Sequence, residues 1–569
     1  MPTAQATASR GPIAPMNVRL EAGASASRSH GWGATGLSLS AWAIAAALLV
    51  PLLVVASTLA IPRGDLWQHL WNTLLGELVV NTLLLLVGVG LGTALLGTTL
   101  AWVVTAHRFP GRRLFDRLLV LPLAMPAYVV GFVVVAQLEF TGPLQTAWRG
   151  WLGPEARLPD IKSRWGVIAT MCLVLYPYVY LLARAAFADM SASLLDAGRS
   201  LGCSSRRLFW RVAVPSARPA IATGVALALM EALADFGTVS LFNVTTFTTA
   251  IYRVWFGMFD REAGSQLASL LLVTALLLIL LERRARGRAR FTQRRGRPVD
   301  AALPPLTGWR AAGAVIYCAL IVALAFLLPL GVLVTWSLQA WEEGRVASTY
   351  PALVSTTLVL AVAAAAVSVS LALVLAYAVR RGTSRWLRRV VDLATMGYAV
   401  PGSVVAVGVL VTLAWLDEGL SRGWQAATGT LPDLLVIGSV GGLLFAYVVR
   451  FAAVARFSVD AGLARITHAI DDAARSLGAR SARLLTQVHV PLLRRSLFTA
   501  ALLVFLDTMK EMPATLLIRP LGWDTLAVEV WQRTTEGLWV EAAVPALSIV
   551  AAGLVPVFLL TALREREAR

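Results

Sequence analysis

The sequence predicts an all-α polytopic membrane protein with about twelve transmembrane helices in two parallel six-helix repeats. Three observations predict it: long apolar runs recur along the chain, arginines gather in alternate loops, and one segment occurs twice at a fixed offset. The 569 residues are 57% hydrophobic and 14% charged, whereas soluble domains carry about 25% charged residues. Runs of about 20 apolar residues match a helix that crosses a bilayer, and their continuity excludes the alternating strands of a barrel.

The apolar runs give the expected spans, with boundaries uncertain by a few residues. The first half is expected to cross the membrane at residues 41–61, 79–105, 118–139, 166–186, 218–240 and 267–281. The second half is expected to cross at residues 311–338, 353–379, 392–415, 434–456, 496–516 and 543–563.

Basic residues set the expected orientation. Arginine-rich stretches lie at residues 106–113, 184–218, 282–297, 380–389 and 456–495, and in the tail from Arg564. Short loops rich in Lys and Arg stay in the cytoplasm, which predicts that both termini are cytoplasmic. The net charge of +18 is then an orientation signal at the lipid headgroups, and it gives no reason to infer nucleic-acid binding.

These features predict four regions. Residues 1–40 are rich in Ala, Ser and Gly and lack an apolar run, so we expect a disordered cytoplasmic tail. The first apolar segment is too long for a signal-peptide core and is expected to be retained. A first transmembrane domain is expected at 41–282, a basic cytoplasmic linker at 283–310 and a second transmembrane domain at 311–569.

The repeat is clearest in one cytoplasmic loop. The segment from Asp196 to Pro215 aligns with the segment from Asp472 to Pro491 at an offset of 276 residues, and twelve of the twenty positions are identical. Further upstream, MPAYVVGFV from Met125 resembles VPGSVVAVG from Val400. Because both halves hold six spans in the same orientation, we expect parallel repeats about an axis along the membrane normal.

Each copy of the loop has the pattern of a helical hairpin. Apolar residues recur at helical spacing, a glycine (Gly202 or Gly478) allows a turn, and a proline (Pro215 or Pro491) marks where a helix ends or restarts. The predicted hairpin lies parallel to the membrane on its cytoplasmic side.

The loop resembles the motif of the permease family of binding-protein-dependent ABC importers, which reads EAA, three residues, Gly, nine residues, then Ile-x-Leu-Pro. Both copies keep this spacing, with Asp for Glu and Val for Ile and Leu. The matching residues are Asp196, Ala197, Gly198, Gly202 and Pro215 in the first copy and Asp472, Ala473, Ala474, Gly478 and Pro491 in the second.

The resemblance implies a fold, partners and a location. It implies an architecture like that of type I ABC importers, in which each loop docks into a cleft on an ATP-binding subunit. One chain would recruit two such subunits and an extracytoplasmic substrate-binding protein, in a bacterial inner membrane. Arg199 and Arg475 could then pair with acidic groups of the partner.

Nucleotide chemistry is expected on another polypeptide. The chain has two lysines, Lys162 and Lys510, and neither has the spacing of a phosphate-binding loop. We therefore expect no enzymatic activity and no bound cofactor in this chain, with ATP and magnesium held by the partner subunit. The five histidines and three cysteines form no metal-ligand pattern, so no metal site is predicted.

Two acidic residues mark a candidate path. Asp235 aligns with Glu511 at the same offset, and a carboxylate inside a span costs about 2.5 to 3.5 kcal/mol, so it should face the bundle interior or a water path. Together they could form an acidic constriction for a cation. The alternative is that they pair with Lys510 or Arg519, or lie near the outer interface.

The strings around these carboxylates resemble fused permeases of ferric-iron importers. These are DFGTVS, which begins at Asp235, and KEMPATLLIRP, which begins at Lys510. Permeases for thiamine, polyamines and sulfate are of the same type and remain alternative assignments. A twelve-span secondary transporter is the main rival from another class, because it too can have two parallel halves. A membrane-embedded enzyme is disfavoured, since no nucleophile, base and orienting acid occur together in the spans.

Overall fold

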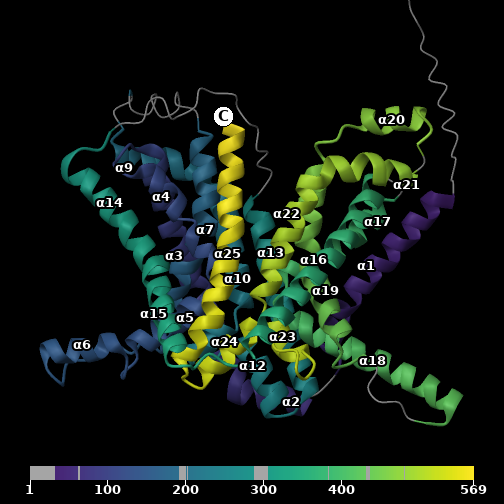
Figure 1. The fold of residues 1–569 in the computed structure, drawn as a ribbon, viewed down its shortest axis with the longest axis horizontal. Helices are drawn as coiled ribbons and strands as arrows, with labels where there is room; N and C mark the ends of the chain where they lie inside the picture. The colour runs from purple at the N-terminus through teal and green to yellow at the C-terminus, as the bar shows by residue number, and fades with distance from the viewer. Residues whose placement is uncertain are drawn as a thin grey trace, which may run out of the picture.

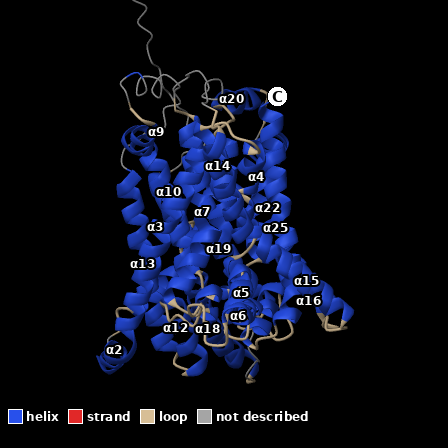
Figure 2. Ribbon diagram, turned by 90° about the vertical axis from the view of Figure 1, so that its left-hand side faces the viewer, coloured by secondary structure: helices blue, strands red, loops and turns tan. Residues whose placement is uncertain are grey.

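The computed structural model describes residues 32–61, 64–190, 200, 203–286, 305–381, 384–430, 436–479 and 481–568. Within these residues the regular structure is helical and no β-strand is present (Figure 2). Eleven of the described helices are long and apolar enough to cross a bilayer, and a further helix is apolar over Trp539–Val555. The prediction of an all-α polytopic membrane protein is confirmed.

The helices fall into two series, with short 3₁₀ or π-helical turns labelled η. The first half contains α1 (Trp32–Thr58), α2 (Gly64–Leu70), η1 (Trp71–Leu75), α3 (Gly76–Ala106), α4 (Arg112–Leu118), η2 (Leu121–Ala124), α5 (Ala127–Leu138), α6 (Pro143–Leu152), α7 (Arg164–Ala188), α9 (Ser205–Leu208), η3 (Phe209–Ala213), α10 (Val214–Ala234), α11 (Gly237–Leu241), α12 (Phe247–Tyr252), η4 (Arg253–Gly257) and α13 (Arg261–Arg286). The second half contains α14 (Gly308–Val322), η6 (Ala323–Leu327), α15 (Leu328–Glu342), α16 (Tyr350–Arg380), α17 (Arg385–Ala394), η7 (Gly397–Ala399), α18 (Gly402–Thr428), α19 (Val440–Leu463), α20 (His468–Ser476), α21 (Ser481–Arg483), η8 (Leu484–His489), α22 (Val490–Met509), α23 (Pro513–Ile518), α24 (Leu526–Thr535) and α25 (Trp539–Ala568).

The sequence repeat is also a structural repeat. Helices α3, α7 and α10 pack on one another in the first half, as α16, α19 and α22 do in the second. The short elements correspond too, since α4 and η2 match α17 and η7, and α11 matches α23. Close packing in the first bundle depends on small residues, because a Cβ added at Gly88 would lie 2.8 Å from Ile168 and one at Gly92 would lie 2.2 Å from the Cys172 sulfur.

The first helix of each half packs against the other half. Helix α1 lies on α16, α17 and α18, whereas α14 and α15 lie on α4 and α5 of the first half. The Thr99 hydroxyl of α3 and the Tyr317 hydroxyl of α14 are 2.7 Å apart across this boundary. Figure 1 shows α1 and α14 on opposite flanks of the molecule. This exchange joins the halves into one bundle.

Four predicted spans cross a break in the helix and are not continuous. The predicted spans 118–139 and 392–415 are interrupted before Pro126 and Pro401, where Met125 and Val400 are extended. A residue that precedes proline is driven out of the helical region, which explains both interruptions. The predicted spans 218–240 and 496–516 are interrupted between α10 and α11 and between α22 and α23. Hydropathy alone does not register these breaks.

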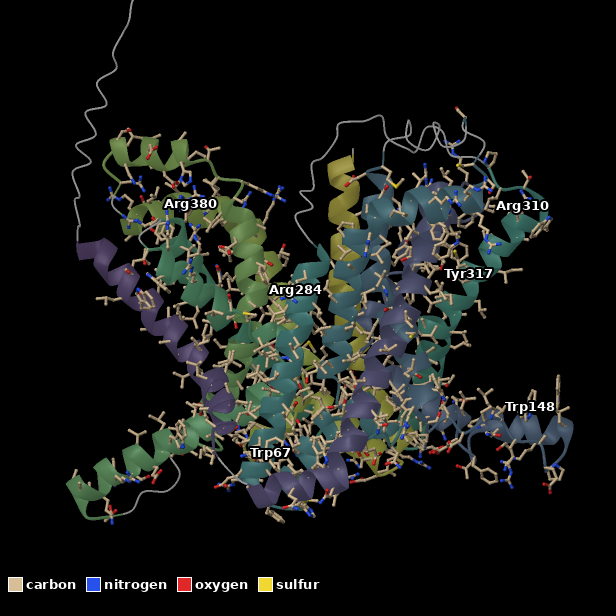
Figure 3. All side chains as sticks on the ribbon, turned by 180° about the vertical axis from the view of Figure 1, so that it is seen from behind. Trp67, Trp148, Arg284, Arg310, Tyr317 and Arg380 are labelled. Atoms are coloured by element: carbon tan, nitrogen blue, oxygen red, sulfur yellow. The ribbon has the colours of Figure 1, made fainter. Side chains whose placement is uncertain are left out.

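The two ends of the bundle carry different elements. Helices α9 and α20 lie at one end together with the C-terminus, while α6 and the last turns of α18 project at the opposite end (Figure 1). Arg310 and Arg380 lie toward the end that carries α20, and Trp67 and Trp148 lie toward the other (Figure 3). The predicted tail at 1–40 is described only from residue 32, and residues 287–304 of the predicted linker lie outside the described part of the chain.

Candidate functional site

The second copy of the repeated loop forms a helical hairpin at one end of the bundle. Helix α20 ends at Ser476, the chain turns at Gly478, and α21 and η8 lead into α22. Gly478 has φ of +82°, and its N–H donates to the Arg475 carbonyl over 2.9 Å. A left-handed glycine after the last helical turn is a common way to end a helix, because it has no Cβ to clash. The hairpin therefore needs a residue at this position that adopts the left-handed conformation readily.

One face of α20 is exposed at the tip of the hairpin. Asp472 and Arg475 are exposed and form an ion pair over 3.1 Å, and the Leu477 side chain is 87% exposed. Asp472 is the fifth residue of α20, so it lies past the first turn, whose N–H groups have no partner within the helix.

A buried network that the sequence did not predict holds this hairpin to the end of α16. Asp471, 4% exposed, pairs with Arg380 over 3.1 Å and lies 2.7 Å from Nε2 of the fully buried His489. Arg380 also donates to the carbonyls of Leu463 and Ile466 over 2.6 and 2.8 Å. These contacts therefore fix the hairpin to the bundle.

The same network shifts the pKa of Asp471. Burial acts to raise its pKa, but the hydrogen bonds with His489 and Arg380 outweigh burial and hold the pKa below its ordinary value. The stabilisation from the carboxylate is therefore present at neutral pH and is lost as the pH falls through this lowered pKa.

Most of the first copy of the loop lies outside the described residues. Asp196, Ala197, Gly198, Arg199 and Gly202 are all in this part, so their predicted roles stay predictions.

The two prolines that close the copies are described. Pro215 and Pro491 lie in the first turns of α10 and α22. The chain does not leave the helical path at either proline, because the π-helical turns η3 and η8 run directly into these helices. Proline lacks an N–H, so it is tolerated where a new helical ladder begins.

A cavity of about 90 Å³ lies between the two halves. Tyr178 lies near the middle of α7 and Arg450 near the middle of α19, which places the space near mid-depth of the bundle. We call this space the central cavity. Its ionisable and tyrosine lining residues are Tyr128, Tyr178, Glu231, Asp235, Tyr398, Arg450, Asp507, Lys510 and Glu511.

The acids of the central cavity form two pairs related by the repeat. Asp235 and Glu511, which the sequence singled out, both line the cavity at the breaks that follow α10 and α22. One turn earlier, Glu231 and Asp507 also line it, at the same offset of 276 residues. This second pair was not predicted from the sequence, although the same offset of 276 residues relates its two members.

The bases come from the second half alone. Arg450 donates to Glu511 over 2.9 Å, and Lys510 pairs with Asp507 over 2.9 Å. The expected alternative, in which Lys510 or Arg519 pairs with Asp235 or Glu511, is not what the structure shows, since Arg519 pairs with Asp524. The four carboxylates exceed the two bases by two charges.

The two predicted carboxylates also organise the backbone at the breaks. Asp235 accepts hydrogen bonds from the N–H groups of Thr238 and Val239 over 2.9 and 3.1 Å. Glu511 accepts one from the N–H of Ala514 over 2.9 Å. Each carboxylate therefore stabilises the start of the short helix that follows it. Within the described residues, no three His, Cys, Asp or Glu side chains gather to hold a metal ion.

Comparison with known proteins identifies the family. The profile described as "Binding-protein-dependent transport system inner membrane component" matches residues 93–283 and matches again at residues 368–569. The chain belongs to this family. The two matches begin 275 residues apart, in agreement with the repeat, and each includes one copy of the loop. The chain is thus a fused permease of an ABC importer, with two permease halves in one multi-pass membrane polypeptide.

Relatives of the permease carry different substrates. The Fe(3+)-transport system permease protein FbpB 2 of Haemophilus influenzae is 26% identical over 87% of this chain and 91% of its own length. The sulfate transport system permease protein CysT of Escherichia coli is 29% identical over 41% of this chain and 84% of its own length. The iron permease therefore aligns with both halves of this permease, and the sulfate permease aligns with less than half of it.

Proposed function

We propose that this permease translocates ferric iron, delivered by an extracytoplasmic binding protein, through the central cavity into the cytoplasm. The observation that carries the proposal is the set of four carboxylates at mid-depth, arranged as two repeat-related pairs. Charged groups at this depth are costly and are found where they serve a path for ions or polar substrates. Carboxylate oxygens are also the ligands that hard cations prefer.

The charge of the cavity separates iron from sulfate. Glu511 is paired with Arg450, and Asp507 is paired with Lys510, on which the charge of Glu231 also acts. In the described part of the chain, no ion pair joins Glu231 or Asp235 to a base of its own. A dianion such as sulfate would be repelled by the two remaining charges in a space of low dielectric constant. The likeness to an Fe(3+) permease over 87% of this chain supports the same choice.

We propose that the two repeated loops couple ATP hydrolysis on the partner subunits to motion of the permease. Helices α9 and α20 lie at one end of the bundle, so two copies of an ATP-binding subunit could engage the two halves side by side (Figure 1). Arg310 and Arg380 lie at the same end (Figure 3), which favours a cytoplasmic location for this end and for both termini. ATP and magnesium are then held by the partner, and closure of the two subunits rocks the permease halves.

The substrate is tested by reconstituting the permease with its ATP-binding subunit and its binding protein. The binding protein is loaded in turn with ferric iron, thiamine, a polyamine or sulfate, and the rate of ATP hydrolysis is measured. We expect stimulation by the ferric form over the unloaded protein. Stimulation by any of the other three instead of ferric iron would overturn the assignment.

A further inference from the structure

Tyr128 has an unusual position in the first turn of α5. It directly follows the break at Pro126, lines the central cavity and is 7% exposed. A Cβ added at Gly237 would lie 2.7 Å from the Cβ of Tyr128, so glycine there makes room for the tyrosine. The packing fixes the base of the side chain beside the helix that Asp235 caps.

The hydroxyl of Tyr128 has no hydrogen-bond partner within the described part of the chain. Other buried tyrosines in the bundle are paired: Tyr176 donates to the Leu119 carbonyl over 3.0 Å, and the Tyr447 hydroxyl is 2.6 Å from that of Thr515. A buried hydroxyl without a partner is destabilising, and a phenylalanine would fill the same space without this cost. Packing therefore does not explain why the residue is tyrosine.

The surroundings of Tyr128 indicate what the hydroxyl contacts. The cavity that it lines also holds Asp235 from the first half and Glu511 from the second, and the charges of both carboxylates and of Lys510 act on the Tyr128 hydroxyl. A phenol is a hydrogen-bond donor and a hard oxygen ligand, which suits the oxygen-rich shell of a trivalent cation. We propose that the Tyr128 hydroxyl contacts the coordination shell of the ferric ion as the ion passes between Asp235 and Glu511.

This inference rests on the proposed function. It adds one substrate contact, which comes from the first half of the permease and lies on the wall of the path. Each half contributes two acids to the cavity, but both bases come from the second half, and the first half contributes Tyr128 and Tyr178. We expect this contact to be transient, because the described residues hold no group of three His, Cys, Asp or Glu side chains that would bind a metal tightly. A path must bind its ion weakly enough to release it.

The repeat supplies a matched control. Ser403 occupies the position equivalent to Tyr128, in the first turn of α18 after Pro401. Its hydroxyl is fully buried and likewise has no partner within the described residues, but the residue does not line the central cavity. Removing this hydroxyl tests the effect of losing an unpaired buried group without touching the path.

The test uses the complete transporter with ferric-loaded binding protein in proteoliposomes. We expect Tyr128→Phe to lower ferric uptake per ATP hydrolysed by about tenfold, the value of one hydrogen bond to a charged group. Its melting temperature should equal or exceed that of the wild type, and Ser403→Ala should take up iron normally.

Three results would overturn the inference: normal uptake by Tyr128→Phe, an equal loss in Ser403→Ala, or a lower melting temperature for Tyr128→Phe, which would reveal a structural role. A wild-type transporter that takes up no ferric iron would refute the proposed function itself. A failure of the inference about Tyr128 is therefore distinguishable from a failure of the proposed function.

Discussion

Replacing Arg450 by leucine is expected to lower the stability of the permease by about 3 to 5 kcal/mol and to abolish uptake. Arg450 donates to Glu511 over 2.9 Å, and the two side chains are 12% and 4% exposed. Without the guanidinium, Glu511 keeps a charge near the middle of the bundle with no basic partner. The fall in apparent melting temperature in detergent and the amount of folded protein in the membrane measure this effect.

A double variant distinguishes the effect of an unpaired charge on Glu511 from the effect of losing the arginine side chain. The variant that combines Arg450→Leu with Glu511→Gln removes both charges of this pair, and the amide oxygen can still accept from the N–H of Ala514. We expect most of the stability to return while uptake stays low, because the path has lost a carboxylate. A double variant as unstable as Arg450→Leu alone would contradict the role assigned to the ion pair.

Replacing Gly478 by proline is expected to uncouple ATP hydrolysis from uptake while membrane insertion is retained. Proline holds φ near −65°, but Gly478 has φ of +82°, and proline also removes the N–H that bonds to the Arg475 carbonyl. The exposed face of α20 would then be displaced from its partner. Uptake per ATP hydrolysed, measured in proteoliposomes, should fall by at least about tenfold, which corresponds to about 1.4 kcal/mol of lost coupling.

Asparagine at the same position is the matched control. Asparagine tolerates the left-handed conformation better than other residues, and a Cβ at position 478 would meet no atom within 4 Å. Gly478→Asn should therefore transport at close to the wild-type rate. Normal uptake in Gly478→Pro would refute the coupling role of the hairpin. The sequence predicts the same result for Gly202→Pro in the first copy.

The architecture could be predicted because two simple signals report it. Hydropathy locates spans, and a constant offset between segments such as those ending at Pro215 and Pro491 reveals the repeat. The packing of α1 and α14 against the opposite halves could not be predicted, because the sequence of an apolar helix does not indicate which bundle it packs against. The breaks before Pro126 and Pro401 were visible as prolines, but continuous hydropathy concealed them.

The site was predicted in part. The offset paired Asp235 with Glu511, and the structure places both in the central cavity. Their partners were missed, because Arg450 lies 61 residues from Glu511 and only the packing of α19 on α22 brings them together. The role of Asp471 was missed for the same reason, since its partner Arg380 lies 91 residues earlier in the chain. Contacts between distant segments leave no periodic trace in a sequence.

The most direct test of the account compares ferric-iron uptake by proteoliposomes that contain the permease alone with uptake by the complete system. The complete system adds the ATP-binding subunit, the loaded binding protein and ATP. We predict no ATP hydrolysis and no uptake by the permease alone, even under an imposed proton or sodium gradient, and ATP-dependent uptake by the complete system. Gradient-driven uptake by the lone chain would contradict the account and would favour a secondary transporter.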